Sequence, residues 1–85
     1  MDIYDFAESI QTKQDFDEFL KMLNRDFISN KSEWENDTIG RYLDSMYGFS
    51  ISMDGYYQNK KELVDLNTPT WNMVAKLLLA AKIYE

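Results

Sequence analysis

Apolar residues recur every three or four positions over most of this chain, a spacing typical of α-helices that turn one face toward a core. The first clear pattern follows Thr12, the expected N-cap of a helix with Asp15 at its third position. Its apolar positions are Phe16, Phe19, Leu20, Leu23 and Phe27. They predict a helix of about four turns. Before it, the apolar residues of segment 3–10 indicate a shorter helical turn or an extended arm.

A second long helix is expected after the polar segment 30–38. Within that segment, Ser32 and Glu35 have the spacing of a capping box, which predicts a short helical turn that carries Trp34. The long helix that follows has its apolar positions at Ile39, Tyr42, Leu43, Met46, then Phe49 or Ser50, and Met53. Gly55 is the expected left-handed residue at its end.

The end of this second helix allows an alternative. Residues 50–53 alternate between polar and apolar, and Asp54-Gly55 is a strong turn signal for a β-hairpin. A short hairpin that pairs residues 51–53 with residues 56–58 is therefore the competing prediction.

The last third of the chain predicts a loop followed by the most apolar helix. Residues 56–67 are expected to form the connection, with Leu63, Val64 and Leu66 packed on the core. Thr68-Pro69 predicts a helix start, because proline is favoured in the first helical turn. Residues 73–81 are apolar at eight of nine positions, so this helix is either the centre of the bundle or also part of a protein interface.

These patterns predict an all-α fold. We expect a single helical domain over residues 1–85, built as a small bundle of three main helices plus a short extra helical turn, with the apolar C-terminal helix central. Three glycines and one proline are too few for the many turns of an all-β fold. The core is expected to bury Phe19, Leu23, Leu43 and Leu78 together.

Two residue types that serve many active sites are missing from the sequence. The chain contains no histidine and no cysteine. Histidine is the side chain best suited to proton transfer near neutral pH, and cysteine is a ready nucleophile and a soft metal ligand. The sequence also lacks a glycine-rich phosphate loop and the ligand spacing of a calcium loop. We therefore expect no enzymatic activity, no cofactor and no metal site.

Charge is distributed unevenly along the chain. Residues 1–54 carry 12 acidic and 5 basic side chains, a net charge of −7, while residues 55–85 carry 3 acidic and 4 basic side chains, a net charge of +1. The acidic part argues against a nucleic-acid backbone or an anionic membrane surface as a ligand. It favours a basic protein partner, because opposite charges steer the two surfaces together.

The candidate partner-binding residues combine aromatic rings with carboxylates. Tyrosine offers a large contact area with a polar tip, so it is a favoured anchor at protein interfaces. The residues that we expect to contact a basic, toxin-like partner are Asp37, Asp44, Tyr47, Asp54, Tyr56 and Tyr57. The alternative function is a regulatory or scaffold protein that forms a homodimer through its apolar C-terminal helix.

The sequence also predicts where the protein acts. No segment approaches the roughly 20 apolar residues of a membrane-spanning helix. The first residues are acidic where a secretory signal peptide would be basic. We therefore expect a cytoplasmic protein.

Three short motifs carry a resemblance to a known group of proteins. They are Trp34-Glu35-Asn36, then Asp54-Gly55-Tyr56-Tyr57, then Pro69-Thr70-Trp71 with the terminal Ala81-Lys82-Ile83-Tyr84-Glu85. In this respect the chain, from about Asp15 to Glu85, resembles a family of small uncharacterised bacterial domains with no established biochemical activity. Its size and acidity also resemble the immunity proteins of bacterial toxin systems. The resemblance implies an uncharacterised domain, with immunity-type protein binding as the expected function.

Overall fold

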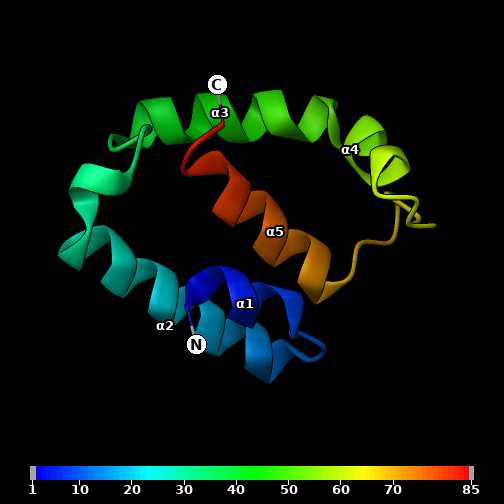
Figure 1. Cartoon of the computed structure of the whole chain (residues 1–85), viewed down its shortest axis with the longest axis horizontal. Coiled ribbons are helices and arrows are strands. Elements are labelled where there is room, and N and C mark those ends of the chain that lie inside the picture. The colour runs from blue at the N-terminus through cyan, green and yellow to red at the C-terminus, as the bar shows by residue number, and fades with distance from the viewer. Residues whose placement is uncertain (1, 85) are drawn as a thin grey trace.

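The computed structural model describes residues 2–84, and within them the chain forms five α-helices and one 3-10 turn (Figure 1). In chain order they are α1 (Ile3–Glu8), α2 (Lys13–Ser29), η1 (Lys31–Glu33), α3 (Ile39–Ile51), α4 (Met53–Asn59) and α5 (Trp71–Ala81). The described residues contain no strand, so the predicted all-α fold is confirmed and the hairpin alternative is wrong. Met1 and Glu85, the last residue of the terminal motif, lie outside the described residues.

Helix α5 lies at the centre of the bundle, as its apolar sequence predicts. It contacts α1 and α2 on one side and α3 on the other (Figure 1). Ala75 and Ala81 of this helix are completely buried. Their small side chains let the backbones of the neighbouring helices approach closely, which is why the chain can wrap around α5 on several sides.

Side-chain caps set where two of the long helices begin. The Thr12 hydroxyl accepts a hydrogen bond from the Asp15 N–H at 3.1 Å, and the Asp15 carboxylate accepts one from the Thr12 N–H at 3.3 Å. This is the predicted capping box. Helix α5 begins two residues later than predicted, because Thr70 and not Thr68 is its N-cap. The Thr70 hydroxyl accepts a hydrogen bond from the Met73 N–H at 3.2 Å, which fixes the start of α5 at Trp71.

The short turn before α3 also differs from the prediction. Ser32 does not cap a helix, because the chain folds into the 3-10 turn η1, which starts one residue earlier, at Lys31. Trp34 follows this turn in an extended conformation and is buried.

A break at Ser52 separates α3 from α4, where the sequence predicted one helix ending at Gly55. Ser52 leaves helical geometry, and its hydroxyl donates a hydrogen bond to the carbonyl oxygen of Gly48. Gly55 lies inside α4 and does not adopt the left-handed conformation. Phe49, Met53 and Tyr57 follow one another at intervals of four residues across the break, and all three are buried in the same core cluster.

The core has two clusters that share α5. The first lies between α1, α2 and α5 and includes Phe19, Leu23 and Trp34, with Leu78 packed against it. The second joins α3, α4 and α5 through Phe49, Met53, Tyr57 and Met73. Of the four residues predicted to be buried together, Leu43 is the exception, because it faces solvent.

The apolar residues of the connection before α5 also do not reach the core. Residues 56–59 belong to α4 and not to the connection. Leu63 is fully exposed, and Val64 and Leu66 are 38% and 39% exposed. None of the three belongs to either core cluster, so the prediction that they pin the loop to the core is wrong.

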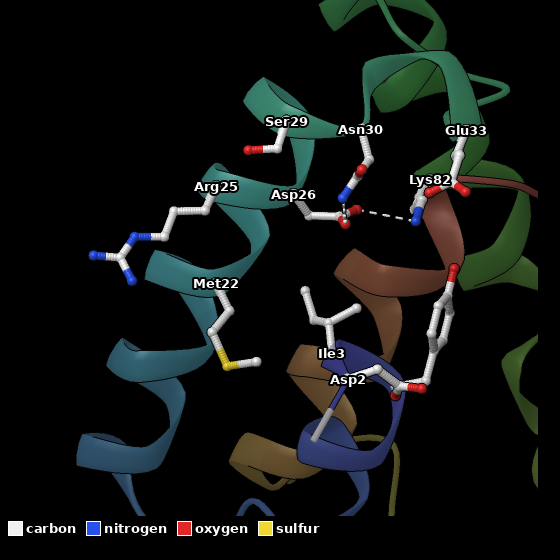
Figure 2. Close-up of a pocket in the computed structure, with 10 residues that line it drawn as sticks. Asp2, Ile3, Met22, Arg25, Asp26, Ser29, Asn30, Glu33 and Lys82 are labelled. Atoms are coloured by element: carbon white, nitrogen blue, oxygen red, sulfur yellow. Dashed lines mark hydrogen bonds and ion pairs between the residues drawn. The ribbon is translucent and has the colours of Figure 1, made fainter.

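One carboxylate ties together three parts of the chain. Asp26 on α2 lies 3.0 Å from the Nζ atom of Lys82, which follows α5 and is only 4% exposed (Figure 2). The same carboxylate accepts a hydrogen bond from Trp34 Nε1 at 2.8 Å and one from Asn30 Nδ2 at 3.0 Å. We call Asp26, Lys82, Trp34 and Asn30 the Asp26 cluster. It fixes the end of α5 and the indole of Trp34 against α2.

The Asp26 cluster keeps both charges of its ion pair. Burial works to raise the pKa of Asp26, but hydrogen bonds from Lys82, Asn30 and Trp34 outweigh it, so the pKa lies below the ordinary 3.8. Burial likewise works to lower the pKa of Lys82, and hydrogen bonds with Asp26 and Tyr4 outweigh it, so that pKa lies above the ordinary 10.5. Both groups are therefore charged over the whole neutral range.

Replacing Asp26 by asparagine is expected to lower the free energy of unfolding by about 3–5 kcal/mol, because Lys82 would keep a buried charge without a counter-ion. Asp17→Asn is the matched control, since Asp17 is an exposed carboxylate on the same helix that pairs with Lys13. It should change the free energy by no more than about 0.5 kcal/mol. Urea unfolding measures both. An equal decrease in the free energy of unfolding in the two variants would contradict the role of Asp26 as the counter-ion of a buried charge.

The stability of the fold should depend on pH through the ionisation of Asp26 and Lys82. A lowered carboxylate pKa stabilises the fold above pH 3.8, and that contribution is lost as pH falls through the folded pKa of Asp26. The raised pKa of Lys82 stabilises the fold below pH 10.5, and that contribution is lost as pH rises through its folded pKa. In urea titrations, the difference in free energy of unfolding between wild type and Asp26→Asn should become smaller at both low and high pH. A difference that stays constant into acid would show that Asp26 is not the titrating group.

Removal of the Tyr57 hydroxyl, in the second cluster, is expected to stabilise the fold. Tyr57 is 2% exposed, and its hydroxyl has no hydrogen-bond partner among residues 2–84. Burial raises the pKa of Tyr57 to about 12, so the group stays neutral. Tyr57→Phe should raise the free energy of unfolding by about 1 kcal/mol, because it removes an unsatisfied polar atom.

Tyr42→Phe is the matched control for that variant. The Tyr42 hydroxyl donates a hydrogen bond to the Leu78 carbonyl oxygen at 2.6 Å. Its removal should lower the free energy of unfolding by about 1 kcal/mol. If thermal and urea unfolding show both variants destabilised to the same extent, the Tyr57 hydroxyl has a partner and the prediction is wrong.

Candidate functional site

The outer face of α3 carries a row of large, exposed apolar side chains. Ile39, Leu43, Tyr47 and Ile51 follow one another at intervals of four residues, and they are 73%, 54%, 68% and 65% exposed. Residues four apart lie on one face of a helix, so the four side chains form a continuous row. We call this row the α3 ridge. Helix α3, which carries the ridge, lies at the edge of the molecule (Figure 1).

Hydrogen bonds to the end of α5 keep the ridge turned outward. The Tyr42 hydroxyl donates to the Leu78 carbonyl oxygen, and the Ser45 hydroxyl donates to the Tyr84 carbonyl oxygen at 2.9 Å. Just before α3, the Asn36 side-chain amide donates to the carbonyl oxygens of Ala81 and Tyr84, both at 3.0 Å. The Leu78 and Ala81 carbonyl groups belong to the last turn of α5, which leaves them without a partner inside the helix, and Tyr84 follows that turn. Because these hydrogen bonds fix the rotation of α3, its other apolar face stays exposed.

The surroundings of the α3 ridge are acidic. Residues 32–59 contain five carboxylates and one guanidinium, a net charge of −4. Asp44 and Asp54 are exposed and form no ion pair with another described residue. Asp37 pairs with Arg41 at 3.3 Å on the surface, where such a pair contributes little to stability. The surface therefore combines apolar contact area with an excess of negative charge.

The predicted partner-binding residues differ in how far they reach this surface. Tyr47 belongs to the α3 ridge, and Asp44 lies beside it in a shallow hollow that both residues line. Asp54 is exposed on α4, while Asp37 precedes α3 and is held by Arg41.

The two tyrosines of α4 lie in the second cluster instead of on this surface. Tyr56 is half-buried against Phe49, and Tyr57 is buried with Met73. A buried ring cannot contact a partner, so the prediction of Tyr57 as an interface anchor is wrong. Tyr57 follows the buried residues Phe49 and Met53 at intervals of four residues, so it lies on the buried side of the chain.

The sequence pattern did not predict that Ile39, Leu43 and Ile51 are exposed members of this surface. The first two were expected in the core, because they share a helical spacing with Tyr42 and Met46. The signal that could have found them is the width of the apolar arc. Apolar residues at 39, 42, 43, 46, 47, 49 and 51 cover more of the helix circumference than one packed face can use.

An aromatic hollow adjoins the α3 ridge at its first residue. Phe27, Trp34, Tyr42 and Ile39 line it, and its volume is about 260 Å³. The ring centroids of Trp34 and Tyr42 are 5.7 Å apart, and those of Phe27 and Trp34 are 5.0 Å apart. The hollow is apolar and shares Ile39 with the ridge, so it extends the same surface.

A larger hollow of about 510 Å³ surrounds the Asp26 cluster (Figure 2). Its charged side chains are Asp2, Arg25, Asp26, Glu33 and Lys82. The carboxylate of Asp26 is already occupied by its three partners, and Arg25 extends away from the ion pair. The polar atoms at the centre of this hollow therefore serve the fold.

Residues 2–84 contain neither a cluster of metal ligands nor a membrane-spanning helix. No three carboxylates among them gather closely enough to hold a metal ion. Within the same part of the chain, none of the helices has the length and apolar character needed to cross a bilayer.

Comparison with known proteins gives one match. No curated protein and no solved structure is significantly similar to the chain. The sequence profile of a family of unknown function, DUF7660, matches residues 12–85, which is nearly the span of the predicted resemblance, from about Asp15 to Glu85. The resemblance to a small uncharacterised family is thereby confirmed, and the chain belongs to the family of unknown function DUF7660.

Proposed function

We propose that this chain is a non-catalytic protein-binding domain that docks a basic partner on the α3 ridge. The observation that carries the proposal is the ridge itself, in which four large apolar side chains in one row are each more than half exposed. Contiguous apolar patches on soluble domains commonly mark interaction sites. The aromatic hollow beside Ile39 would accept one side chain of the same partner.

Charge favours a basic partner over a second copy of the chain. In a symmetric dimer the same surface meets itself, so two regions of net charge −4 would face each other. A basic surface is instead attracted over several ångströms before contact, which raises the association rate. The self-associating scaffold is therefore the second candidate.

The biological setting that fits this surface is an immunity- or antitoxin-like protein that masks a basic toxin domain in the bacterial cytoplasm. Small size, net charge −6 and an exposed apolar ridge support it. The absence of cysteine from the sequence is compatible with a reducing compartment. The absence of histidine and cysteine supports binding over catalysis, because an active site would need other acid–base groups.

The proposal predicts which side chains a partner requires. Leu43→Ser with Tyr47→Ser should weaken binding at least about 30-fold, because it removes two central apolar contacts. Leu20→Ser is the matched control, an exposed leucine on α2, on the other side of α5 from α3. It should change affinity less than about twofold. Quantitative affinity capture with the three forms as baits identifies the partner, and biosensor kinetics measure the affinities.

The salt dependence of binding and the oligomeric state distinguish docking of a basic partner from self-association. Asp44→Lys should slow association several-fold at low salt and much less at high salt, because salt screens the attraction. Capture of a partner equally by all three baits would contradict the ridge as the binding surface. Sedimentation that shows a dimer lost in Leu43→Ser with Tyr47→Ser, with no captured partner, would favour self-association instead.

A further inference from the structure

A second recessed surface lies where α1, α4 and the end of α3 meet α5, and it does not involve the α3 ridge. Its volume is about 170 Å³. Phe49, Leu79 and Ile83 form an apolar floor, and Glu8, Lys76 and Tyr56 bring polar groups to its edge. We call it the Lys76 pocket. Ligand pockets usually measure about 300–1,000 Å³, so this one suits a molecule of only a few heavy atoms.

The Lys76 pocket holds a buried cation beside an exposed carboxylate. Lys76 is 8% exposed, and its Nζ atom lies 3.2 Å from Oε2 of Glu8. Lys60, outside the pocket lining, also approaches this carboxylate, with its Nζ atom 4.0 Å from Oε1. Lys76 is therefore the cation that the pocket itself offers to a ligand.

The two partners of the Lys76 pair differ in how firmly they are held. The side chain of Glu8 is 61% exposed and can move into solvent, whereas that of Lys76 is 9% exposed and is enclosed by α5 and its neighbours. An ammonium group has three donors, and Glu8 is the one ion-pair partner of Lys76 within residues 2–84. The pocket therefore holds a buried cation with donor capacity left for an incoming acceptor.

A tyrosine hydroxyl adds a further donor at the edge of the pocket. The Tyr56 hydroxyl oxygen accepts a hydrogen bond from Lys60 Nζ at 3.3 Å. A tyrosine hydroxyl that accepts in this way still has its own O–H to donate. Ammonium and hydroxyl donors above an apolar floor match a ligand with an anionic end and an apolar body.

We propose that the Lys76 pocket binds a small free monocarboxylic acid, with its carboxylate at Lys76 and its apolar body against Phe49, Leu79 and Ile83. A monocarboxylate brings one negative charge to Lys76, whereas a phosphate dianion would meet stronger repulsion from Glu8. The pocket is small and apolar below its edge, so the acid carries a short alkyl or aryl group. This site is independent of the proposed docking on the α3 ridge.

The test is a titration of the full chain with hexanoate, followed by the methyl NMR signals of Ala7, Ala80 and Ile83. We expect saturable shifts with a Kd of about 1 mM. Hexanol has the same apolar body without the charge and should bind at least about 10-fold more weakly. Absence of shifts at about 50 mM hexanoate, or equal binding of hexanol, would overturn the proposal.

Variants of the two pocket charges sharpen the result. Glu8→Gln should tighten hexanoate binding about threefold or more, because it removes the competing negative charge at an exposed position. Lys76→Met keeps the apolar stem and should weaken binding at least about 10-fold. Lys21→Met, an exposed lysine on α2, is the control and should leave the Kd unchanged. Unchanged affinity in Glu8→Gln would contradict the assignment even if Lys76→Met failed to fold.

One further ligand distinguishes a free acid from the C-terminus of a peptide. N-acetyl-leucine carries the same carboxylate next to a peptide bond. Under the proposal it binds more weakly than hexanoate, because the pocket is too small for the added amide. Tighter binding of N-acetyl-leucine would replace the free acid by a peptide C-terminus.

Discussion

The carboxylate of Asp26 holds the ends of two helices that meet only in the folded chain. Lys82, Trp34 and Asn30 all converge on it, and a charge buried to this extent is tolerated only when its hydrogen-bonding capacity is filled. The pair fixes the end of α5 against α2. It also orients the indole of Trp34, which closes the first core cluster and forms a wall of the aromatic hollow.

The end of α5, held in place by the Asp26 cluster, in turn fixes the position of α3. Its last carbonyl groups accept hydrogen bonds from Tyr42 and Asn36, and the Tyr84 carbonyl accepts one from Ser45. Helix α3 therefore cannot rotate to bury its second apolar face without leaving these acceptors unpaired. The exposed ridge is thus a consequence of polar contacts on the opposite side of the same helix.

Charge separates the two candidate binding surfaces. The region around the α3 ridge has an excess of carboxylates, while the Lys76 pocket encloses the ammonium group of Lys76 beside the exposed Glu8. A basic protein surface and a small organic acid are therefore attracted to different faces of one domain. The net charge of −6 describes only the first of them.

The sequence by itself determined the helical fold class, the capping box at Thr12 and the central place of α5, because short-range spacing and caps set all three. Asp44 and Tyr47 were also found as exposed residues. The tertiary structure decided which face of α3 is buried, since both faces are apolar and long-range hydrogen bonds choose between them. It decided the break at Ser52, the burial of Tyr57 and the meeting of Glu8 with Lys76. Local periodicity cannot reveal such contacts, because they join residues that only the packed helices bring together.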